Sequence, residues 1–532
     1  MKQIYLQKIY IALVVMLISC LPLQAADTYD FVEDGFQFTI LSTSDKTVSV
    51  VGLEDVNTVD ITMPSSVLSQ GVKYTVVAIG DRAFSECKEL KSINIPGHVK
   101  EIGSWAFNEC ESLEWVSIGN SVETIGDRAF FGCKSLPLIS IPGSVKTIGK
   151  YAFAYCNGMM MANIGESVEL IDEGAFYYCQ SLESIKIPNS VTSIGSNLFV
   201  FCDKLKSATL GNSLQAIGDK MFYHCESLES IDMPDTVTSI GSGAFEYCIA
   251  LSNVKFSPSV KTIGDRAFYN CAAMTSVDIP NSVTSIGSES FAYCLALDNI
   301  TLSNSLKTIG DGAFWYCSNM PAIRIPDSVE TLGDRAFKQC FKLYEVDFGN
   351  SLKTIGEGAF NLCINLKSVN IPDSVGAIGN GAFMKCTLLK SVEFGASVES
   401  IGEEAFWECY ELTEVYSRAM TPPVCTGIFE QETTHGTLFV PTGCKSVYAA
   451  IFPWNAFWTI KELDSLGVEG VAADEVAVKA VGGSIVFGGA TEANIYSSAG
   501  ILVASGMMTE TELPAGLYIV VAHGKSHKII VR

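Results

Sequence analysis

Residues 237–256 read V-T-S-I-G-S-G-A-F-E-Y-C-I-A-L-S-N-V-K-F, and this segment decides the fold because close copies of it fill most of the chain. Its cysteine, Cys248, belongs to a series that recurs every 23 residues from Cys87 to Cys409, over fourteen steps without a slip. Self-similarity at a fixed period is typical of supersecondary units stacked into a solenoid. The sequence therefore predicts an elongated repeat protein with a long surface made of nearly identical strips.

Each unit is predicted to hold one short strand and one helical turn. After the cysteine, L-x-x-V-x-I alternates apolar and other residues as a strand does, with Leu251, Val254 and Phe256 facing inward. Before it, I-G-x-x-A-F-x-x-C has turn-like spacing, which indicates a short helical turn after a tight bend at Gly241. Ordering the backbone of one unit costs roughly 23–46 kcal/mol, more than the roughly 10–18 kcal/mol from burying its apolar side chains. Stability must therefore come from stacking against neighbours.

The repeat resembles the BspA-type leucine-rich repeat family, in the 23-residue subclass that is also seen in treponemal surface proteins. The resemblance rests on I-G-x-x-A-F-x-x-C-x-x-L and I-P-x-S-V, which recur from about residue 73 to 417. It departs from the commoner leucine-rich pattern because the cysteine precedes the strand. Local departures, none of which breaks the spacing, are Asp172 at the Gly position and Leu198, Met221 and Ser290 at the Ala position. The resemblance implies an α/β-type solenoid of a surface protein, with host extracellular-matrix or other bacterial proteins as ligands.

A second period of 46 residues lies inside the first. The residue after the strand is Pro in every other unit, where a missing N–H is tolerated at a strand end, and Gly or Ser in the units between. We interpret this alternation as growth by duplication of repeat pairs. The two series are Pro96, Pro142, Pro188, Pro234, Pro280, Pro326 and Pro372, and Gly119, Gly165, Gly211, Ser257, Ser303, Gly349 and Gly395.

A row of aromatic residues stands one or two positions before the cysteine in every unit from Cys133 to Cys317. Because the Phe of the A-F pair already fills the core, we expect these rings to be at least partly exposed, as at many binding surfaces. The alternative is that they cover neighbouring repeats and seal the stack. The row is Phe131, Tyr155, Tyr177, Tyr178, Phe201, Tyr223, Tyr247, Tyr269, Tyr293, Trp315 and Tyr316.

A second candidate surface lies on the outward face of the predicted strands. The position before the strand's Val is usually Ser, but in three consecutive units it holds Trp115, Leu138 and Met161. Strands in register would gather these side chains into one apolar patch. A partner site and a contact with the N-terminal cap both explain such a patch.

The repeated cysteines are predicted to form a ladder of buried free thiols rather than disulfides or metal ligands. Their number is odd, all occupy the same place in the repeat, and paired C-x-x-C motifs are absent from the sequence. Cys425 and Cys444 lie outside the array, where a disulfide between them is an open possibility.

The N-terminal residues read as a secretory signal, because Lys2 and Lys8 precede a short apolar run at residues 9–18. An alternative is a lipobox that ends in Cys20 and would lipidate it. No later segment looks transmembrane. The predicted organisation is 1–26 signal peptide, 27–72 β cap, 73–417 solenoid of about fifteen repeats, 418–464 C-terminal cap, 465–475 acidic linker and 476–532 small β-sandwich domain.

The last domain resembles the C-terminal sorting domain of the Bacteroidota type IX secretion route. The resemblance rests on L-P-A-G-x-Y at residues 513–518 and on the basic closing strand at 528–532. It implies export across the outer membrane, and such a domain is often removed afterwards. The alternative is an ordinary immunoglobulin-like surface module.

Charge and motif content point to a binding protein without cofactors. The net charge of −23 argues against nucleic acid and anionic membrane as partners, since both need basic patches. The five histidines are scattered, and no nucleophile, zinc-protease, P-loop or dinucleotide motif occurs in a suitable context. We therefore expect a non-enzymatic, exported, adhesin-like protein that binds an extracellular protein. A glycan-binding module and a structural spacer in the cell envelope are the alternatives.

Overall fold

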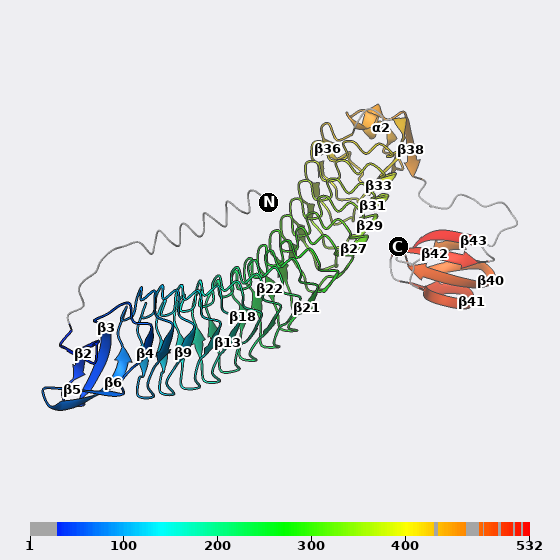
Figure 1. Ribbon diagram of the computed structural model, residues 1–532. Helices are drawn as coiled ribbons and strands as arrows, with labels where there is room; N and C mark the ends of the chain where they lie inside the picture. Colours follow the sequence, from blue (N-terminus) through cyan, green and yellow to red (C-terminus); the bar gives the residue numbers. More distant parts are fainter. Residues whose placement is uncertain are drawn as a thin grey trace.

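The computed structural model describes residues 29–429, 435–463, 478–481, 484–497, 502–513, 516–522 and 525–531. The predicted signal peptide, Cys20 and the acidic linker at 465–475 lie outside the described residues. Residues 29–429 and 435–463 form a long, curved stack of coils that runs from β2 (Phe36–Ser42) to β38 (Thr459–Leu463) (Figure 1). The predicted repeat solenoid is thus confirmed.

The first coil is preceded by a small β meander. Its strands β1, β2 and β3 are antiparallel, β6 runs parallel to β3 and antiparallel to β5, and β8 of the array then pairs with β6. The meander therefore closes one end of the core and starts the parallel ladder. The bounds are β1 (Phe31–Glu33), β2 (Phe36–Ser42), β3 (Thr47–Leu53), β4 (Asp60–Thr62), β5 (Ser66–Ser69) and β6 (Val72–Ile79).

Each coil of the array holds two short parallel strands, one more than predicted. The longer one is the expected L-x-x-V-x-I strand: β7 (Ser92–Asn94), β9 (Trp115–Ser117), β11 (Leu138–Ser140), β13 (Met161–Asn163), β15 (Ser184–Lys186), β17 (Ser207–Thr209), β19 (Ser230–Asp232), β21 (Asn253–Lys255), β23 (Ser276–Asp278), β25 (Asn299–Thr301), β27 (Ala322–Arg324), β29 (Glu345–Asp347), β31 (Ser368–Asn370), β33 (Ser391–Phe394) and β35 (Glu414–Ser417). The shorter one ends at an Ile in most coils, at Leu332 in β28 and at Cys425 in β36: β8 (Glu101–Ile102), β10 (Thr124–Ile125), β12 (Thr147–Ile148), β14 (Leu170–Ile171), β16 (Ser193–Ile194), β18 (Ala216–Ile217), β20 (Ser239–Ile240), β22 (Thr262–Ile263), β24 (Ser285–Ile286), β26 (Thr308–Ile309), β28 (Thr331–Leu332), β30 (Thr354–Ile355), β32 (Ala377–Ile378), β34 (Ser400–Ile401) and β36 (Val424–Cys425).

The predicted helical turns are wrong: the segment between the short strand and the cysteine is a series of non-helical turns in the described coils. Two residues in it have left-handed backbone angles, for example Arg266 (φ 54°) and Asn270 (φ 56°), and such residues cannot continue a right-handed helix. Their N–H groups donate instead to the next coil, to the carbonyls of Ser288 and Ala292 at 2.8 Å. Hydrogen bonds between coils therefore replace the bonds within a helix.

A continuous stack of phenylalanine rings fills the core. The Phe of each A-F pair, from Phe84 to Phe406, is fully buried. Neighbouring centroids lie 4.9–5.8 Å apart, and the ring planes are within 20° of parallel. The spacing of one ring per coil matches the separation of paired strands, which is why a single residue type can occupy the position throughout.

The repeated cysteines form the predicted ladder of free, buried thiols. From Cys110 onward, each Sγ donates to the carbonyl of the Phe 26 residues earlier, as Cys248 does to Phe222 at 3.1 Å. Gly241 has a different role from the predicted bend. A Cβ there would lie 2.5 Å from Asp219 Oδ1, so the glycine lets adjacent coils approach.

The 46-residue period has a structural counterpart in the longer strands. In the later coils β23 pairs only with β25 and β27 only with β29, each couple with three residue pairs, whereas β31 and β33 belong to a sheet that continues through β35. Where the second coil has Gly, that residue approaches the Pro of the first: a Cβ on Gly119 would lie under 3.0 Å from the Pro96 carbonyl oxygen. In the couple of β23 with β25 the position holds Ser303, whose hydroxyl donates to the Val283 carbonyl. Close packing thus accounts for the alternation, whatever its history.

The C-terminal end of the stack continues through β37 (Thr437–Pro441), α2 (Lys445–Tyr448), η2 (Trp454–Ala456) and β38 (Thr459–Leu463). Tyr448 and Trp454 are buried there and close the core. A separate antiparallel sheet with its own core around Ile495 and Val520 is formed by β39 (Val478–Val481), β40 (Ser484–Ser497), β41 (Leu502–Glu512), β42 (Gly516–Ala522) and β43 (Lys525–Val531). A second facing sheet, which the predicted sandwich requires, is not seen among the described strands.

Candidate binding surface

The predicted apolar patch is present on the outward face of the longer strands. Strand geometry sends alternate side chains to opposite faces, so Val116, Ile139 and Ala162 enter the core. Their neighbours point outward: Trp115 is 53%, Leu138 44% and Met161 48% exposed. The apolar patch is therefore open surface rather than a seal against the core.

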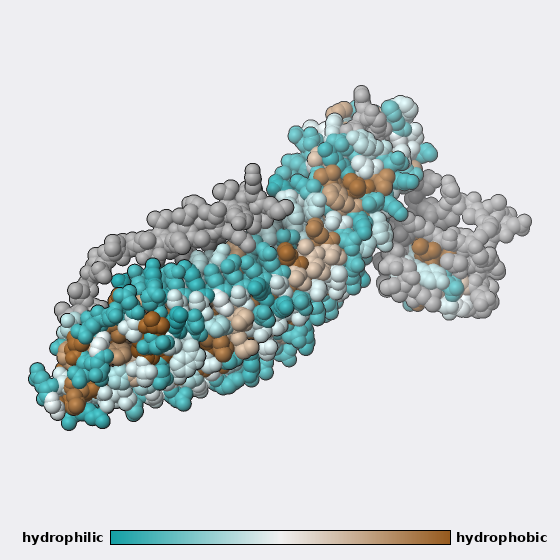
Figure 2. Space-filling view, in the orientation of Figure 1, coloured by the Kyte–Doolittle hydropathy of each residue, from teal (hydrophilic) through white to brown (hydrophobic). Residues whose placement is uncertain are grey.

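Pairing in register joins two of these side chains, and the third lies in the preceding coil, whose strand β9 belongs to a different sheet. Leu138 and Met161 are direct partners in the parallel pair of β11 with β13, and Trp115 stands at the same position of β9 in the preceding coil. Met160, also exposed, extends the group. We call Trp115, Leu138, Met160 and Met161 the apolar patch. Groups of hydrophobic side chains separated by hydrophilic ones are visible on the array in Figure 2.

One exposed charge borders the apolar patch directly, because Glu114 precedes Trp115 at the position that Met160 occupies two coils later. The other outward side chains of the same three strands are Ser117, Ser140 and Asn163. A second acidic group, Glu166, follows β13 in the coil of Met161, and its Oε1 lies 2.7 Å from Lys186 Nζ of the next coil. The apolar patch is therefore bordered by neutral polar groups and by acidic ones, an arrangement that disfavours a strongly acidic ligand.

The aromatic row is brought together as a ladder, but not as an open surface. Phe131, Tyr177 and Phe201 are only 7%, 5% and 2% exposed, so the expectation that they are partly exposed is wrong. The other eight rings are intermediate in exposure, so for them the expected partial exposure is found. Consecutive rings touch, as Phe131 does Tyr155 at 5.2 Å between centroids and Tyr247 does Tyr269 at 5.5 Å. Because the coils are so close, each ring covers its neighbour.

The hydroxyls of this ladder are held in their neutral form. Burial raises the pKa of Tyr155 and that of Tyr269 to about 12. Burial also raises the pKa of Tyr177. Rings packed in this way stiffen the stack more than they offer contact area.

Sequence reasoning missed residues that extend and brace the ladder. Trp105 stacks with the guanidinium of Arg128, 4.5 Å from its ring, and His224 lies between Phe201 and Tyr247 at 4.8 and 4.3 Å. Arg266 lies 3.7 Å from the ring of Tyr269 and pairs with Glu246 and Glu289. These Trp, Arg and His residues stand one or five positions before the repeated cysteine. Their regular place in the 23-residue repeat is the sequence signal that could have identified them.

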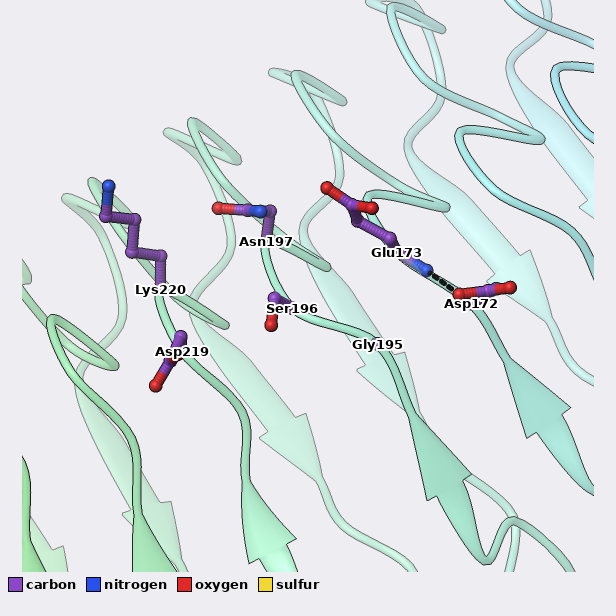
Figure 3. Close-up of a pocket in the computed structure, with 7 residues that line it drawn as sticks. All are labelled: Asp172, Glu173, Gly195, Ser196, Asn197, Asp219 and Lys220. Carbon is purple, nitrogen blue, oxygen red and sulfur yellow. Dashed lines mark hydrogen bonds between the residues drawn. The ribbon is translucent and has the colours of Figure 1, made fainter.

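A shallow, polar depression of about 510 Å³ lies elsewhere on the array (Figure 3). It contains none of the predicted site residues. Among the described residues, no group of three or more His, Cys, Asp or Glu side chains is placed to hold a metal ion. The lining residues are Asp172, Glu173, Gly195, Ser196, Asn197, Asp219 and Lys220.

The possible disulfide between Cys425 and Cys444 is not formed, because both thiols are free. Each has a different neighbour: Cys425 Sγ lies 3.5 Å from the carbonyl of Pro423, and Cys444 Sγ lies 4.0 Å from Met420 Sδ. In the described part of the chain, no helix is long and apolar enough to cross a membrane.

Comparison with known proteins gives a family match over most of the array. The model of the BspA type leucine rich repeat region matches residues 63–182, 169–297, 215–343 and 307–435. A search of curated proteins found no match.

Solved structures also resemble the chain. A leucine-rich repeat protein from Bacteroides ovatus is 33% identical, with 73% of this chain and 94% of that chain covered and a TM-score of 0.60. A leucine rich cell surface protein from Faecalibacterium prausnitzii is 28% identical, with coverage of 74% and 96% and a TM-score of 0.42. The pneumococcal vaccine antigen PcpA is 19% identical, with coverage of 83% and 98% and a TM-score of 0.38.

Proposed function

Because the chain belongs to the BspA-type leucine-rich repeat family, we propose that it is an exported surface protein that binds an extracellular protein through its apolar patch. The proposal makes it a binding protein rather than an enzyme. The signal-like residues 1–26 and the sorting-like motif at 513–518 support export to the cell surface.

The exposure of the apolar patch carries this proposal. Trp and Met are over-represented among interface anchors, because they supply large and adaptable contact area. Covering the exposed half of Trp115 removes roughly 100 Å² of apolar surface from water, worth about 2.5 kcal/mol. The aromatic row, which the sequence also suggested, is a weaker candidate because its rings are already packed against one another.

A glycan ligand is the second candidate, favoured by the neutral polar side chains beside Trp115. Ser117, Ser140 and Asn163 supply donors and acceptors next to an aromatic ring, as sugar sites do. The packed aromatic ladder favours the third reading, in which the array is a stiff spacer without a specific ligand.

Binding of the purified chain to immobilised fibronectin, to fibrinogen and to a glycan array separates these readings. The test variant is Trp115→Ser/Leu138→Ser/Met161→Ser, which leaves the buried side of the strands intact. The control is Tyr344→Ser, because Tyr344 is 44% exposed beside β29, far along the array from the apolar patch.

We expect saturable protein binding that the triple variant weakens at least tenfold and the control leaves unchanged. Equal loss in both variants, or binding unaffected by the triple variant, would place the contact surface elsewhere. A response to glycans alone would support the second candidate, and none on any surface would favour the spacer.

A further inference from the structure

The ladder of shorter strands is interrupted at one place among the described coils, between β16 and β18. Elsewhere the N–H of the residue after the short strand donates to the Ile or Leu carbonyl of the previous coil, as Gly195 does to Ile171 and Gly241 to Ile217, both at 2.9 Å. The corresponding bond from Gly218 to Ile194 is missing. We call this interruption the seam.

The two coils are also further apart at the seam. A Cβ on Gly218 would have its nearest neighbour at 3.4 Å, whereas one on Gly241 would meet Asp219 Oδ1 at 2.5 Å. Ile194 is partly exposed there, although its counterparts Ile217 and Ile240 are buried. The depression in Figure 3 opens at the same place, with Asn197 on one side and Lys220 on the other.

Two bulky side chains explain the separation. The repeat has Ala before the core Phe, but the two coils that meet at the seam have Leu198 and Met221 there, both fully buried. In register these side chains stack on each other, where neighbouring coils stack alanines such as Ala152 and Ala175. Overfilling a packed core forces backbone shifts, and the ladder beside these residues is what has shifted.

The remaining connections across the seam are intact. The longer strands β15 and β17 keep three residue pairs. On the turn side, Phe199 donates its N–H to Met221 at 2.8 Å, and the ring of Phe201 packs against Tyr223 and His224 at 5.7 and 4.8 Å. The contact between the two coils is therefore lost along the shorter strands and kept along the longer strands and the turns, which is the geometry of a hinge.

We propose that the seam is a flexible joint, at which residues 29–206 and 207–463 tilt by opening and closing the short-strand edge. The contacts of Phe201 with Tyr223 and His224 form the pivot. The axis of the stack changes direction just beyond this coil, between β18 and the strands that follow β22 (Figure 1). The apolar patch lies on the N-terminal side, so the joint would set its orientation relative to the rest of the array.

Hydrogen exchange of the full chain, followed by mass spectrometry, tests the joint. An amide without its partner opens more readily, so we expect peptides covering 214–219 to exchange about tenfold faster than those covering 237–242. In the variant Leu198→Ala/Met221→Ala, which removes the overfilling, the two rates should become equal. Small-angle scattering of the same variant should give a narrower distribution of interatomic distances.

The matched variant Ala244→Leu/Ala267→Met places the same pair two interfaces beyond the seam, where the ladder of shorter strands is continuous. It should accelerate exchange around Gly264, whose N–H now donates to Ile240 at 2.9 Å, and broaden the scattering distribution. Equal exchange of 214–219 and 237–242 in the natural chain would overturn the joint. No acceleration around Gly264 in the matched variant would overturn its cause, even if the alanine variant fails to fold.

Discussion

Replacing Gly119 by Ala tests whether the 46-residue period is a packing requirement. The added Cβ would lie under 3.0 Å from the Pro96 carbonyl oxygen, a distance that real Cβ atoms essentially never show. The obstacle is backbone, so the coil itself must move. Gly143 stands one residue after a Pro and offers a control, because a Cβ there would meet nothing within 4 Å.

Gly119→Ala should lower the free energy of unfolding, whereas Gly143→Ala should leave it unchanged or raise it. Overfilling a packed site costs typically about 1–3 kcal/mol, and Gly119→Ala should destabilise the array by that amount. Gly143→Ala has no such cost and reduces the freedom of the unfolded chain, so it should be neutral or stabilising by about 0.4–1 kcal/mol. Ser257 and Ser303 occupy the Gly119 position in two other coils, where their hydroxyls donate to Asp235 and Val283 carbonyls. Alanine gains no such bond.

Urea unfolding followed by far-ultraviolet circular dichroism measures the difference, with hydrogen exchange of residues 94–120 as a local readout. Long repeat arrays need not unfold in one step. If circular dichroism and hydrogen exchange disagree, the hydrogen exchange of residues 94–120 is therefore the measurement that decides. If Gly119→Ala and Gly143→Ala have the same stability, the close approach of the Pro and Gly coils is not what maintains the alternation.

Two further outcomes follow from the core. Phe245→Ala removes a fully buried ring that stacks on Phe222 at 5.3 Å and Phe268 at 5.1 Å, and should cost about 3–5 kcal/mol in urea unfolding. Phe245→Leu keeps most of the buried apolar volume and loses mainly the ring contacts, so it should cost less. Equal stability of Phe245→Ala and the natural chain would refute the core position of this ring. Burial raises the pKa of Cys87 to about 11 and the pKa values of Cys294 and Cys340 to about 12. Because the thiols of the unfolded chain ionise at lower pH than these buried ones, the free energy of unfolding should fall as pH rises from about 9 toward 12. Cys294→Ala should reduce that slope in unfolding titrations, and an unchanged slope would contradict the assignment.

The apolar patch shows how far a sequence can lead toward a candidate site. The Ser that usually occupies the outward strand position is replaced in three consecutive coils by Trp115, Leu138 and Met161. Because successive side chains of a strand point to opposite faces, the sequence alone shows which face each residue lies on. The aromatic row shows the limit. Tyr177 and Tyr178 are adjacent and chemically alike, yet only Tyr177 is almost fully buried, because ring packing between coils decides their exposure.

The sequence by itself determined the solenoid, its 23-residue coil, the inward Phe, Cys and Leu positions and the outward patch, because periodicity states which side chains share a face. Only the tertiary structure decided what depends on distances between coils. Left-handed residues such as Asn270 replaced the expected helical turns, since their N–H groups find partners in the next coil rather than their own. Leu198 and Met221 kept the spacing of 23 but opened the seam, since only stacking in register turns two harmless substitutions into one overfilled site.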